Sequence, residues 1–537
     1  MTAVEPADAQ DSLSEPFLVR HLVALGLAVE YVRAEGNILY RRGADGAELP
    51  VLDLVGGFGA TVLGHNHPEL TRYAAELLDA RTPVLAQFSL HPWADDVARK
   101  LNAVLHREFG TDEPYSVIFA NSGAEAVEAA VKHAELDRVM RVEALRREVE
   151  DGVREARTAV RGGAALDPAA RAALTAGSAG VAGGDGLQDA EALERLVREV
   201  AEADAPHWDA PPVFLAAEGA FHGKLVGSVQ LTHNAAFRAP FRALAAPCRF
   251  APLDRPGRLA ELAREERRTV SALTVADGVV GVTARELPRV GAVVLEPVQG
   301  EGGIREVGPE FAAQAARTAE EAGCPVVVDE IQSGMGRTGA FFASSLVGLR
   351  GDYFVLAKGL GGGLAKAAAL LVRQSRYRPE FEMAHSSTFA KDGFSTRLAG
   401  RVLDLLEADG GALYRLARDT GERLTARLEG VRNDFKDVVK DVRGRGLMLG
   451  VEFHDPAAAG PPALQEHVRA GTFGYVLSGY LLREHAVRVF PTASATSTLR
   501  IEPSVHLSEA EMDQAESALR GLCRVLRDGD GDRLLAG

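Results

Sequence analysis

Two short apolar runs in the middle of the chain each end in residues that can do chemistry. Residues 326–328 (Val-Val-Val) are followed by Asp329 and Glu330, and residues 353–357 are followed by Lys358. Runs without polar alternation are typical of strands buried in a parallel sheet, and open α/β sheets bind ligands at the carboxyl ends of their strands. We therefore expect a carboxylate and an amine to meet at one edge of a sheet.

An amine and a carboxylate at neighbouring strand ends suit pyridoxal phosphate (PLP), which needs a Schiff-base lysine and an acid facing its pyridinium nitrogen. Each signal alone is weak, because a strand that ends in Asp-Glu is common and a lysine before glycines can be a solvated loop residue. Together they predict that Lys358 forms the Schiff base and moves a substrate proton. Asp329 would keep the ring nitrogen protonated.

A third motif, NSGAEA at residues 121–126, follows a predicted strand at residues 115–120 and opens a predicted helix. It places Ser122, Gly123 and Ala124 at the helix N-terminus, where free N–H groups and the positive dipole end bind anions. Asn-Ser is also an ordinary helix cap. Its position before the Asp329 and Lys358 strands favours a site for the PLP phosphate.

In this order, the words NSGAEA, DEIQSGMGRTG and AKGLGGG resemble the class III aminotransferases, the fold-type-I PLP family that includes ornithine and 4-aminobutyrate aminotransferases. The resemblance covers about residues 32–525, apart from one insertion. It implies an α/β fold with a mostly parallel central sheet sandwiched by helices, and a smaller α+β domain built from the N- and C-terminal segments. It also implies a homodimer with shared active sites and ping-pong transfer of an amino group from an amino acid donor to an aldehyde or keto acceptor.

The resemblance assigns further cofactor contacts by position. They are Phe221 stacked on the pyridine ring, Ile331 on its opposite face, His222 at Asp329 or at the ring, Glu296 on the Asp329 side, Gln332 at the ring hydroxyl, and Thr388 at the phosphate of the neighbouring subunit. An aromatic stack would hold the plane of the ring without competing for its nitrogen.

The same resemblance implies a substrate pocket. Glu301 and Arg500 would pair to open and close a carboxylate site, although a purely structural ion pair has the same sequence signal. Lys224 stands where several relatives have an arginine that grips a substrate carboxylate, and lysine cannot reproduce that bidentate clamp. An ornithine- or 4-aminobutyrate-type substrate is therefore in doubt. Phe58 and Phe88 would line the pocket, or serve as plain core residues.

The Gly- and Pro-rich breaks and the spacing of the apolar residues indicate how the chain is divided. We expect a disordered leader at 1–15, the N-terminal part of the small domain at 16–95, a large PLP-binding domain at 96–395 and a C-terminal small domain at 396–537. An insertion at 135–210 predicts two charged amphipathic helices around a Gly/Ala-rich connector. It can be a surface appendage, a substrate-access lid, a docking arm or a dimer contact. Residues 32–53 predict two strands joined by a polar turn.

Composition restricts the remaining function classes. The 537 residues carry a formal charge of −15, which argues against nucleic-acid binding. No run of eighteen apolar residues predicts a membrane span. Three distant cysteines indicate a reducing cytoplasm, with neither a disulfide framework nor metal-ligand spacing. Two alternatives remain: a PLP enzyme of the same fold for decarboxylation, racemisation, aminomutase or carbon–carbon bond chemistry, and a non-catalytic structural or regulatory relative.

Overall fold

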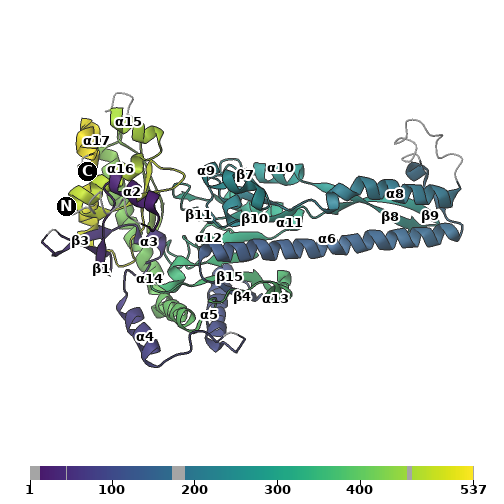
Figure 1. The fold of residues 1–537 in the computed structure, drawn as a ribbon, viewed down its shortest axis with the longest axis horizontal. Coiled ribbons are helices and arrows are strands. Elements are labelled where there is room, and N and C mark those ends of the chain that lie inside the picture. The colour runs from purple at the N-terminus through teal and green to yellow at the C-terminus, as the bar shows by residue number, and fades with distance from the viewer. Residues whose placement is uncertain (1–12, 44, 87, 172–187, 456–461, 536–537) are drawn as a thin grey trace.

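A seven-stranded sheet forms the centre of the molecule (Figure 1) in the computed structural model, which describes residues 13–43, 45–86, 88–171, 188–455 and 462–535. Its strands are, in spatial order, β4 (Tyr115–Ala120), β15 (Ala368–Arg373), β14 (Tyr353–Leu356), β13 (Val326–Asp329), β10 (Val290–Leu295), β6 (Val213–Ala217) and β7 (Cys248–Ala251). β15 runs in the opposite direction to the other six strands of this sheet. The predicted α/β class with a mostly parallel sheet is confirmed.

Helices cover both faces of this sheet, so its strands have no polar side. Alternate residues of β13 enter separate cores: Val326 and Val328 pack in one, and Val327 in the other. Because successive side chains of a strand point to opposite faces, both faces must be apolar. This explains the continuous apolar runs in the sequence. The main flanking helices are α5 (Pro92–Phe109), α6 (Gly123–Arg161), α10 (Gly257–Glu265), α11 (Pro309–Ala322), α12 (Ala343–Val347) and α14 (Gly393–Asp434).

The N- and C-terminal segments meet at one end of the molecule (Figure 1), where β3 pairs in parallel with β18. One four-stranded sheet contains β1 (Tyr31–Glu35), β2 (Ile38–Arg42), β3 (Glu48–Asp53) and β18 (Val487–Arg488), and a second contains β16 (Val439–Arg445), β17 (Met448–Phe453), β20 (Thr498–Ile501) and β19 (Phe490–Pro491). The helices of this part are α2 (Pro16–Ala24), α15 (Pro462–Arg469), α16 (Phe473–His485), α17 (Glu509–Asp528) and α18 (Gly531–Leu535), while α4 (Pro68–Asp79) packs against α14.

The expectation of two strands between residues 32 and 53 was wrong, because the structure has three. Glu35 pairs with Ile38, so β1 and β2 form a hairpin around the two residues Gly36 and Asn37. Gly36 has a positive φ of 56° there, as tight hairpin turns require. Gly-Asn between two apolar runs is a recognised hairpin signal that the prediction overlooked.

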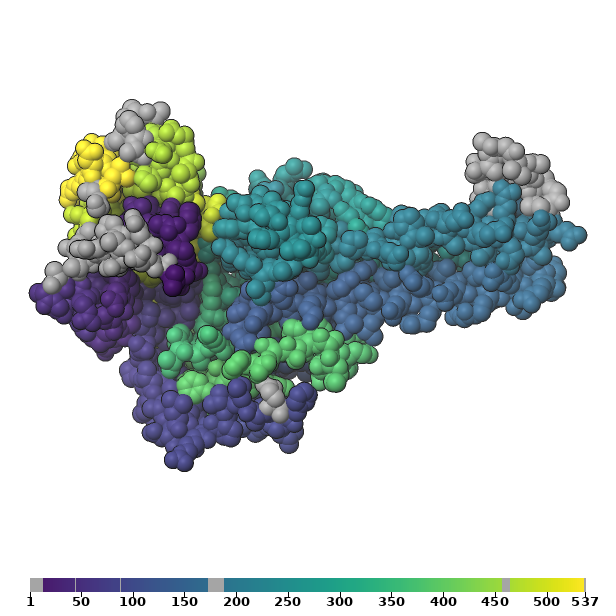
Figure 2. Space-filling view, in the orientation of Figure 1, coloured from purple at the N-terminus to yellow at the C-terminus, as the bar shows by residue number. Residues whose placement is uncertain are grey.

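A long arm leaves the body at the opposite end (Figures 1 and 2). It consists of the second half of α6, the helix α8 (Asp189–Trp208) and a hairpin of β8 (Arg268–Ala276) and β9 (Val279–Leu287), to which β5 (Ala165–Leu166) adds. Two helices were expected in residues 135–210, but the first is a continuation of α6 with no break at 135. The connector at 176–186 and the leader residues 1–12 lie outside the described residues.

The hairpin of the arm was not predicted. Its turn is Asp277-Gly278, both with positive φ, between strands of nine residues each. Asp-Gly at a two-residue turn is a strong local signal for a hairpin. Leu273 and Val280 of the hairpin pack with Ala156 of α6 and with α8. The arm therefore has a small core of its own. None of the described helices is apolar over enough of its length to cross a bilayer.

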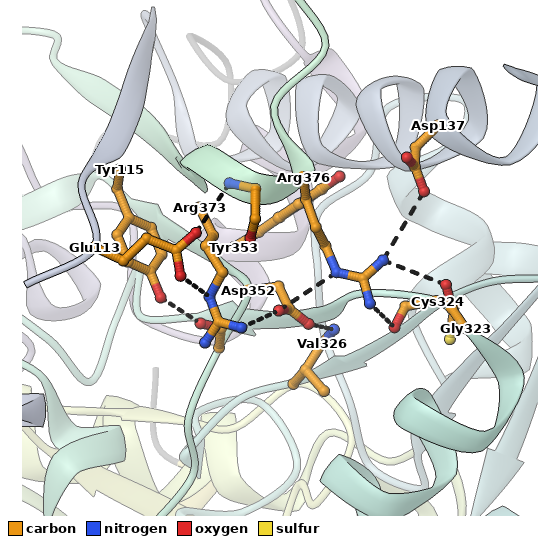
Figure 3. Close-up of polar contacts among 12 residues, drawn as sticks. Glu113, Tyr115, Asp137, Gly323, Cys324, Val326, Asp352, Tyr353, Arg373 and Arg376 are labelled. Atoms are coloured by element: carbon orange, nitrogen blue, oxygen red, sulfur yellow. Dashed lines mark hydrogen bonds and ion pairs between the residues drawn. The ribbon is translucent and has the colours of Figure 1, made fainter. Parts of the chain in front are cut away.

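A polar network closes the edge of the central sheet where β13 and β14 begin (Figure 3). Asp352 accepts a hydrogen bond from the Val326 N–H at 2.9 Å and forms ion pairs with Arg373 at 3.1 Å and Arg376 at 3.4 Å. Arg376 also donates to the carbonyls of Gly323 and Cys324 at 3.3 Å each. Every one of these charged groups has several partners, so the network binds neighbouring strands together.

Candidate active site

The opposite edge of the sheet, where β13 and β14 end, carries the two groups that the sequence singled out. Asp329 is the last residue of β13 and pairs in register with Val355 of β14, three residues before Lys358. Glu330 points elsewhere: its carboxylate accepts hydrogen bonds from the Ser333 hydroxyl and the Ser344 N–H, both at 2.7 Å. Strand alternation thus separates the two acids, and only Asp329 is directed toward Lys358.

Asp329 is nearly fully buried and hydrogen-bonded on both oxygens. Its Oδ2 lies 2.8 Å from His222 Nδ1, and its Oδ1 accepts from the Ile331 N–H at 3.1 Å. Burial alone lowers the pKa of His222, but the hydrogen bond and charge of Asp329 outweigh it, and the net pKa is raised. His222 Nε2 is buried with no partner among the described residues. These hydrogen bonds hold the Asp329 carboxylate in place, and it still has lone pairs that can accept a further hydrogen bond.

Lys358 begins the 3₁₀ turn after β14 in a left-handed conformation, with φ of 44°. Its Nζ donates to Gln332 Oε1 at 2.9 Å. Burial lowers the pKa of this amine, while the charges of Glu502, Glu301 and Asp329 oppose the shift. A lowered pKa increases the fraction of neutral amine, which is the form that attacks a carbonyl carbon.

The N-terminus of α6 lies beside this pair. Ser122 is a true helix cap, because its hydroxyl accepts from the Glu125 N–H while the Glu125 carboxylate accepts from the N–H groups of Asn121 and Ser122. The cap leaves the first-turn N–H groups of Gly123 and Ala124 without intrahelical carbonyls. A Cβ on Gly123 would lie 2.8 Å from Ile331, so the absence of a side chain permits this close approach. The capping and anion-binding interpretations are therefore compatible.

Glu296 extends the acidic side of the cluster. It accepts from the Phe221 N–H at 2.9 Å and from the Gly300 N–H at 3.1 Å. Burial raises the pKa of Glu296 to about 7. The charge of His222 lowers this pKa, and the charge of Asp329 raises it. The Phe221 ring lies 6.5 Å from the ring of Phe237 in an edge-to-face arrangement. The backbone of Phe221 is thus fixed by the same acid that faces His222 and Asp329.

Arg500 and Glu301 form a buried ion pair, with Nη2 and Oε2 at 2.5 Å. The Ala493 N–H donates to the same carboxylate oxygen at 2.6 Å. The guanidinium carbon also lies 4.9 Å from the ring centre of Phe58, which brings that residue to the site. Arg500 Nε and Nη1 are buried without hydrogen-bond partners among the described residues. Unused buried donors of this kind can receive a carboxylate.

Phe88, Lys224 and Thr388 are among the expected residues that are exposed on the single chain. Phe88 lies in the connection between α4 and α5 with its side chain 108% exposed, and Lys224 places its Nζ 4.0 Å from the ring centre of Phe237. Thr388 is exposed, and its neighbour Ser387 accepts from Asn121 Nδ2 at 2.8 Å, so this segment lies at the N-terminus of α6 in its own chain. Their predicted contacts to substrate or to a second subunit stay predictions.

Sequence reasoning missed one group that the structure brings into the cluster. Glu502 is completely buried, and its Oε1 accepts from Gln332 Nε2 at 2.7 Å. Its Oε2 lies 3.9 Å from Arg500 Nη1. The sequence could have indicated this position. Residues two apart in a strand face the same side of the sheet, and Glu502 follows Arg500 by two positions.

These residues fit PLP by their chemistry. A buried amine of lowered pKa, a buried carboxylate with unused lone pairs and a helix N-terminus are what the aldehyde, the pyridinium nitrogen and the phosphate of PLP require. His222 and Arg500 add buried nitrogens that have no hydrogen-bond partner within the described ranges. Fold and site together define a PLP enzyme of fold type I.

Comparison with known proteins identifies the family. Residues 23–519 match the class-III aminotransferases, and the chain belongs to that family. It is 26% identical over 499 residues to the acetylornithine aminotransferase of Aquifex aeolicus (92% of this chain, 96% of the relative) and 29% identical over 472 residues to that of Mycobacterium tuberculosis (87% and 86%).

Solved structures show the same fold. The ornithine aminotransferase of Toxoplasma gondii superposes with a TM-score of 0.64 at 19% identity, covering 93% of this chain and 91% of that chain. The acetylornithine aminotransferase of Elizabethkingia anophelis gives 0.60 at 19% identity, covering 93% and 94%. The protein is a PLP-dependent transaminase, and amino-group transfer is its chemistry. Neither the other PLP chemistries nor a non-catalytic role is favoured.

Proposed function

We propose that the protein transfers an amino group in two half-reactions at one site, from an amino acid donor to an aldehyde or keto acceptor. The observation that carries the proposal is the placement of the Lys358 amine and the Asp329 carboxylate at the ends of two adjacent parallel strands. A single lysine near the reacting carbons can remove a proton in one half-reaction and return it in the other. The carbonyl product of the donor leaves, and the amino group stays in the site, before the acceptor enters, because both half-reactions use the same lysine.

The residues of the site have separate tasks in this scheme. PLP supplies an electron sink for the carbanion formed at the donor carbon. Asp329, supported by His222, presents a negative charge to the ring nitrogen and favours its protonated form. Lys358 holds and moves the proton. Ser122, Gly123 and Ala124 bind the phosphate, and the side chains of Phe221 and Ile331 hold the ring between them.

The substrate assignment rests on Arg500 and Glu301. When Glu301 is paired with Arg500, the carboxylate site is closed, and a substrate carboxylate that displaces Glu301 opens it. The names of the relatives make ornithine and its N-acetyl derivative the first donors to test. Lys224, in place of an arginine clamp, favours donors that do not depend on a second bidentate carboxylate contact.

A homodimer with shared sites is the proposed assembly. Five large apolar side chains are exposed in the segments that precede α5 and α14: Leu85, Phe88, Leu90, Met383 and Phe389. Such patches commonly mark protein–protein interfaces. Covering them with a second copy would also bring Phe88 and Thr388 toward a neighbouring site. The cytoplasm is the proposed location, supported by three cysteines without a disulfide partner in the structure.

The arm has a different proposed role. With a rise of about 1.5 Å per residue, the 39 residues of α6 extend the far end of the arm about 58 Å from the phosphate end of the helix. That distance excludes a lid over the site of the same chain. We propose that the arm contacts another chain, and removing it would test this through the assembly state and activity.

The decisive experiment loads the protein with PLP and screens amino donors and carbonyl acceptors by mass spectrometry. Amino transfer requires conversion of the cofactor to pyridoxamine phosphate by a donor alone, and recovery on adding an acceptor. Borohydride reduction followed by peptide mapping should place the cofactor on Lys358. Absence of conversion with every donor, in a protein whose Lys358 is labelled, would refute the proposed two-step transfer.

A further inference from the structure

Glu502 is a buried carboxylate in the active site to which the scheme above gives no role. It follows β20 directly, and its backbone N–H donates to the Leu54 carbonyl at 2.6 Å. The side chain is 0% exposed. The strand and this backbone bond fix its Cα, so the carboxylate can reach only the groups near it.

The contacts of Glu502 determine which way the Gln332 amide faces. A carboxylate accepts hydrogen bonds and donates none, so the Gln332 atom 2.7 Å from Glu502 must be the NH₂ group. The Gln332 carbonyl oxygen then faces the other way, toward the Lys358 amine at 2.9 Å. A carbonyl oxygen can only accept, and the Lys358 amine donates to it, which requires the same orientation. Both ends of the amide therefore agree.

The space around the Gln332 carbonyl is also limited. Gly300 approaches so closely that a Cβ at this position would overlap the carboxamide oxygen. Gly300 has no positive φ, so any residue could adopt its backbone conformation. Glycine is needed at this position because a side chain would collide with Gln332. Glu502 holds the amide on one side, and the bare Cα of Gly300 leaves room for it on the other.

The second oxygen of Glu502 faces Arg500. Glu502 Oε2 has no hydrogen-bond partner among the described residues and lies 3.9 Å from Arg500 Nη1, which also has none. Glu301 occupies Nη2 of the same guanidinium. Arg500 is thus flanked by two carboxylates, so it stays neutralised by Glu502 when Glu301 moves away.

We infer that Glu502 is a positioning residue: it fixes the Gln332 amide with its carbonyl oxygen on Lys358, and it provides Arg500 with a second carboxylate. This role rests on the proposed function, because it concerns how Lys358 and Arg500 are prepared for the cofactor and the substrate. Glu502 itself touches neither reacting atom. Its influence passes through Gln332 and Arg500.

Glu502→Gln is the test variant, because it keeps the shape and removes the charge. A glutamine can donate as well as accept, so the Gln332 amide loses its fixed orientation. We expect kcat/KM to fall about tenfold, the effect of losing one charge-assisted hydrogen bond. The charge of Glu502 raises the pKa of Lys358 against the effect of burial. Its removal should lower that pKa and shift the pH dependence of PLP attachment to the apoprotein to lower pH. Absorbance reports that attachment without any turnover.

A double-mutant cycle separates positioning from general destabilisation. If Glu502 acts through Gln332, adding Glu502→Gln to Gln332→Met should change kcat/KM less than the single change does in the wild type. Glu301→Gln is the matched control, since it removes an equal charge beside Arg500 but has no contact with Gln332, and it should combine additively with Gln332→Met. Additive effects of both charge changes would overturn the inference.

Gly300→Ala gives a second measurement that leaves Glu502 intact. The new methyl group displaces the Gln332 carbonyl, so the pH dependence of PLP attachment should change relative to the wild type. If Glu502→Gln and Gly300→Ala both bind PLP with unchanged pH dependence, Glu502 has no positioning role. If the wild type itself does not attach PLP at Lys358, the proposed function fails, a result that borohydride labelling distinguishes from the first.

Discussion

The two edges of the central sheet both carry acidic residues and arginines, but these residues have different functions at each edge. Where β13 and β14 begin, Asp352 bonds a backbone N–H and two arginines. Where they end, Arg500 and Glu502 keep buried atoms that have no hydrogen-bond partner in the part of the chain that the structure describes. An unsatisfied buried polar group costs about 1–3 kcal/mol. At the ends of β13 and β14 a ligand can satisfy the open atoms of Arg500 and Glu502, whereas at their starts the protein's own groups satisfy Asp352.

Two buried histidines show the same contrast at the scale of one ring. His133 on α6 has both nitrogens bonded, Nδ1 to the Tyr353 hydroxyl at 2.7 Å and Nε2 accepting from the Arg378 N–H at 3.1 Å. Burial lowers its pKa to about 4. His222 has one nitrogen on Asp329 and a raised pKa. Burial favours the neutral ring of His133, whose two nitrogens are both hydrogen-bonded. The carboxylate of Asp329 favours the protonated ring of His222.

The largest effect should come from the lysine of the active edge. Lys358→Ala removes the group that moves the proton, and kcat should fall by at least about 10³-fold. Reductive labelling with PLP and borohydride should also be lost from the peptide that contains residue 358. The matched control is Lys366→Ala, an exposed lysine eight positions on, which should retain activity. Full activity without Lys358 would contradict the assignment of this edge as the active site.

Replacing the acid of the same edge should have the next largest effect. Asp329→Asn keeps the hydrogen-bonding shape but removes the negative charge, so protonation of the ring nitrogen is no longer favoured. We expect kcat to fall about 10²-fold, in the range found for removal of one preorganised electrostatic group. The absorbance spectrum of the PLP-loaded variant should respond differently to pH. An unchanged kcat would show that the ring nitrogen is not governed by Asp329.

The corresponding change at the opposite edge should reverse the outcome. Asp352→Asn breaks two ion pairs at the start of β14, and the free energy of unfolding should fall by about 3 kcal/mol, as for other partly buried pairs that lose one member. The kcat of the folded enzyme should stay at the wild-type value. Denaturant titration and steady-state kinetics on one preparation would measure both. A large loss of kcat with normal stability would remove the distinction between the edges.

The smallest effect should be a pH dependence of stability from His133. Its folded pKa of about 4 lies below the ordinary 6.5, so between these values the unfolded chain binds a proton that the folded chain does not. Stability from this group is full above pH 6.5 and is lost as the pH falls toward 4. His133→Gln should reduce the fall in thermal midpoint across that range. An identical fall in the variant would assign it to other groups.

Much of the active edge could be predicted from the sequence, because its signals are local. A strand buried on both faces is apolar at every position, so the runs before Asp329 and Lys358 are visible without alignment. The helix cap at Ser122 is equally local, since its capping box spans four consecutive residues. The hairpins of β1–β2 and β8–β9 had local signals too, but two-residue turns are easily overlooked beside longer motifs.

The amino-acid sequence by itself determined the buried strands, the residues at their carboxyl ends and the helix that opens beside them, since each depends on neighbours within a few positions. Only the tertiary structure decided that Glu502 meets Gln332, 170 positions away in the chain. It also decided that residues 268–287 join the arm of α6 and α8. Contacts between distant segments depend on how whole layers pack, and no local pattern records that packing.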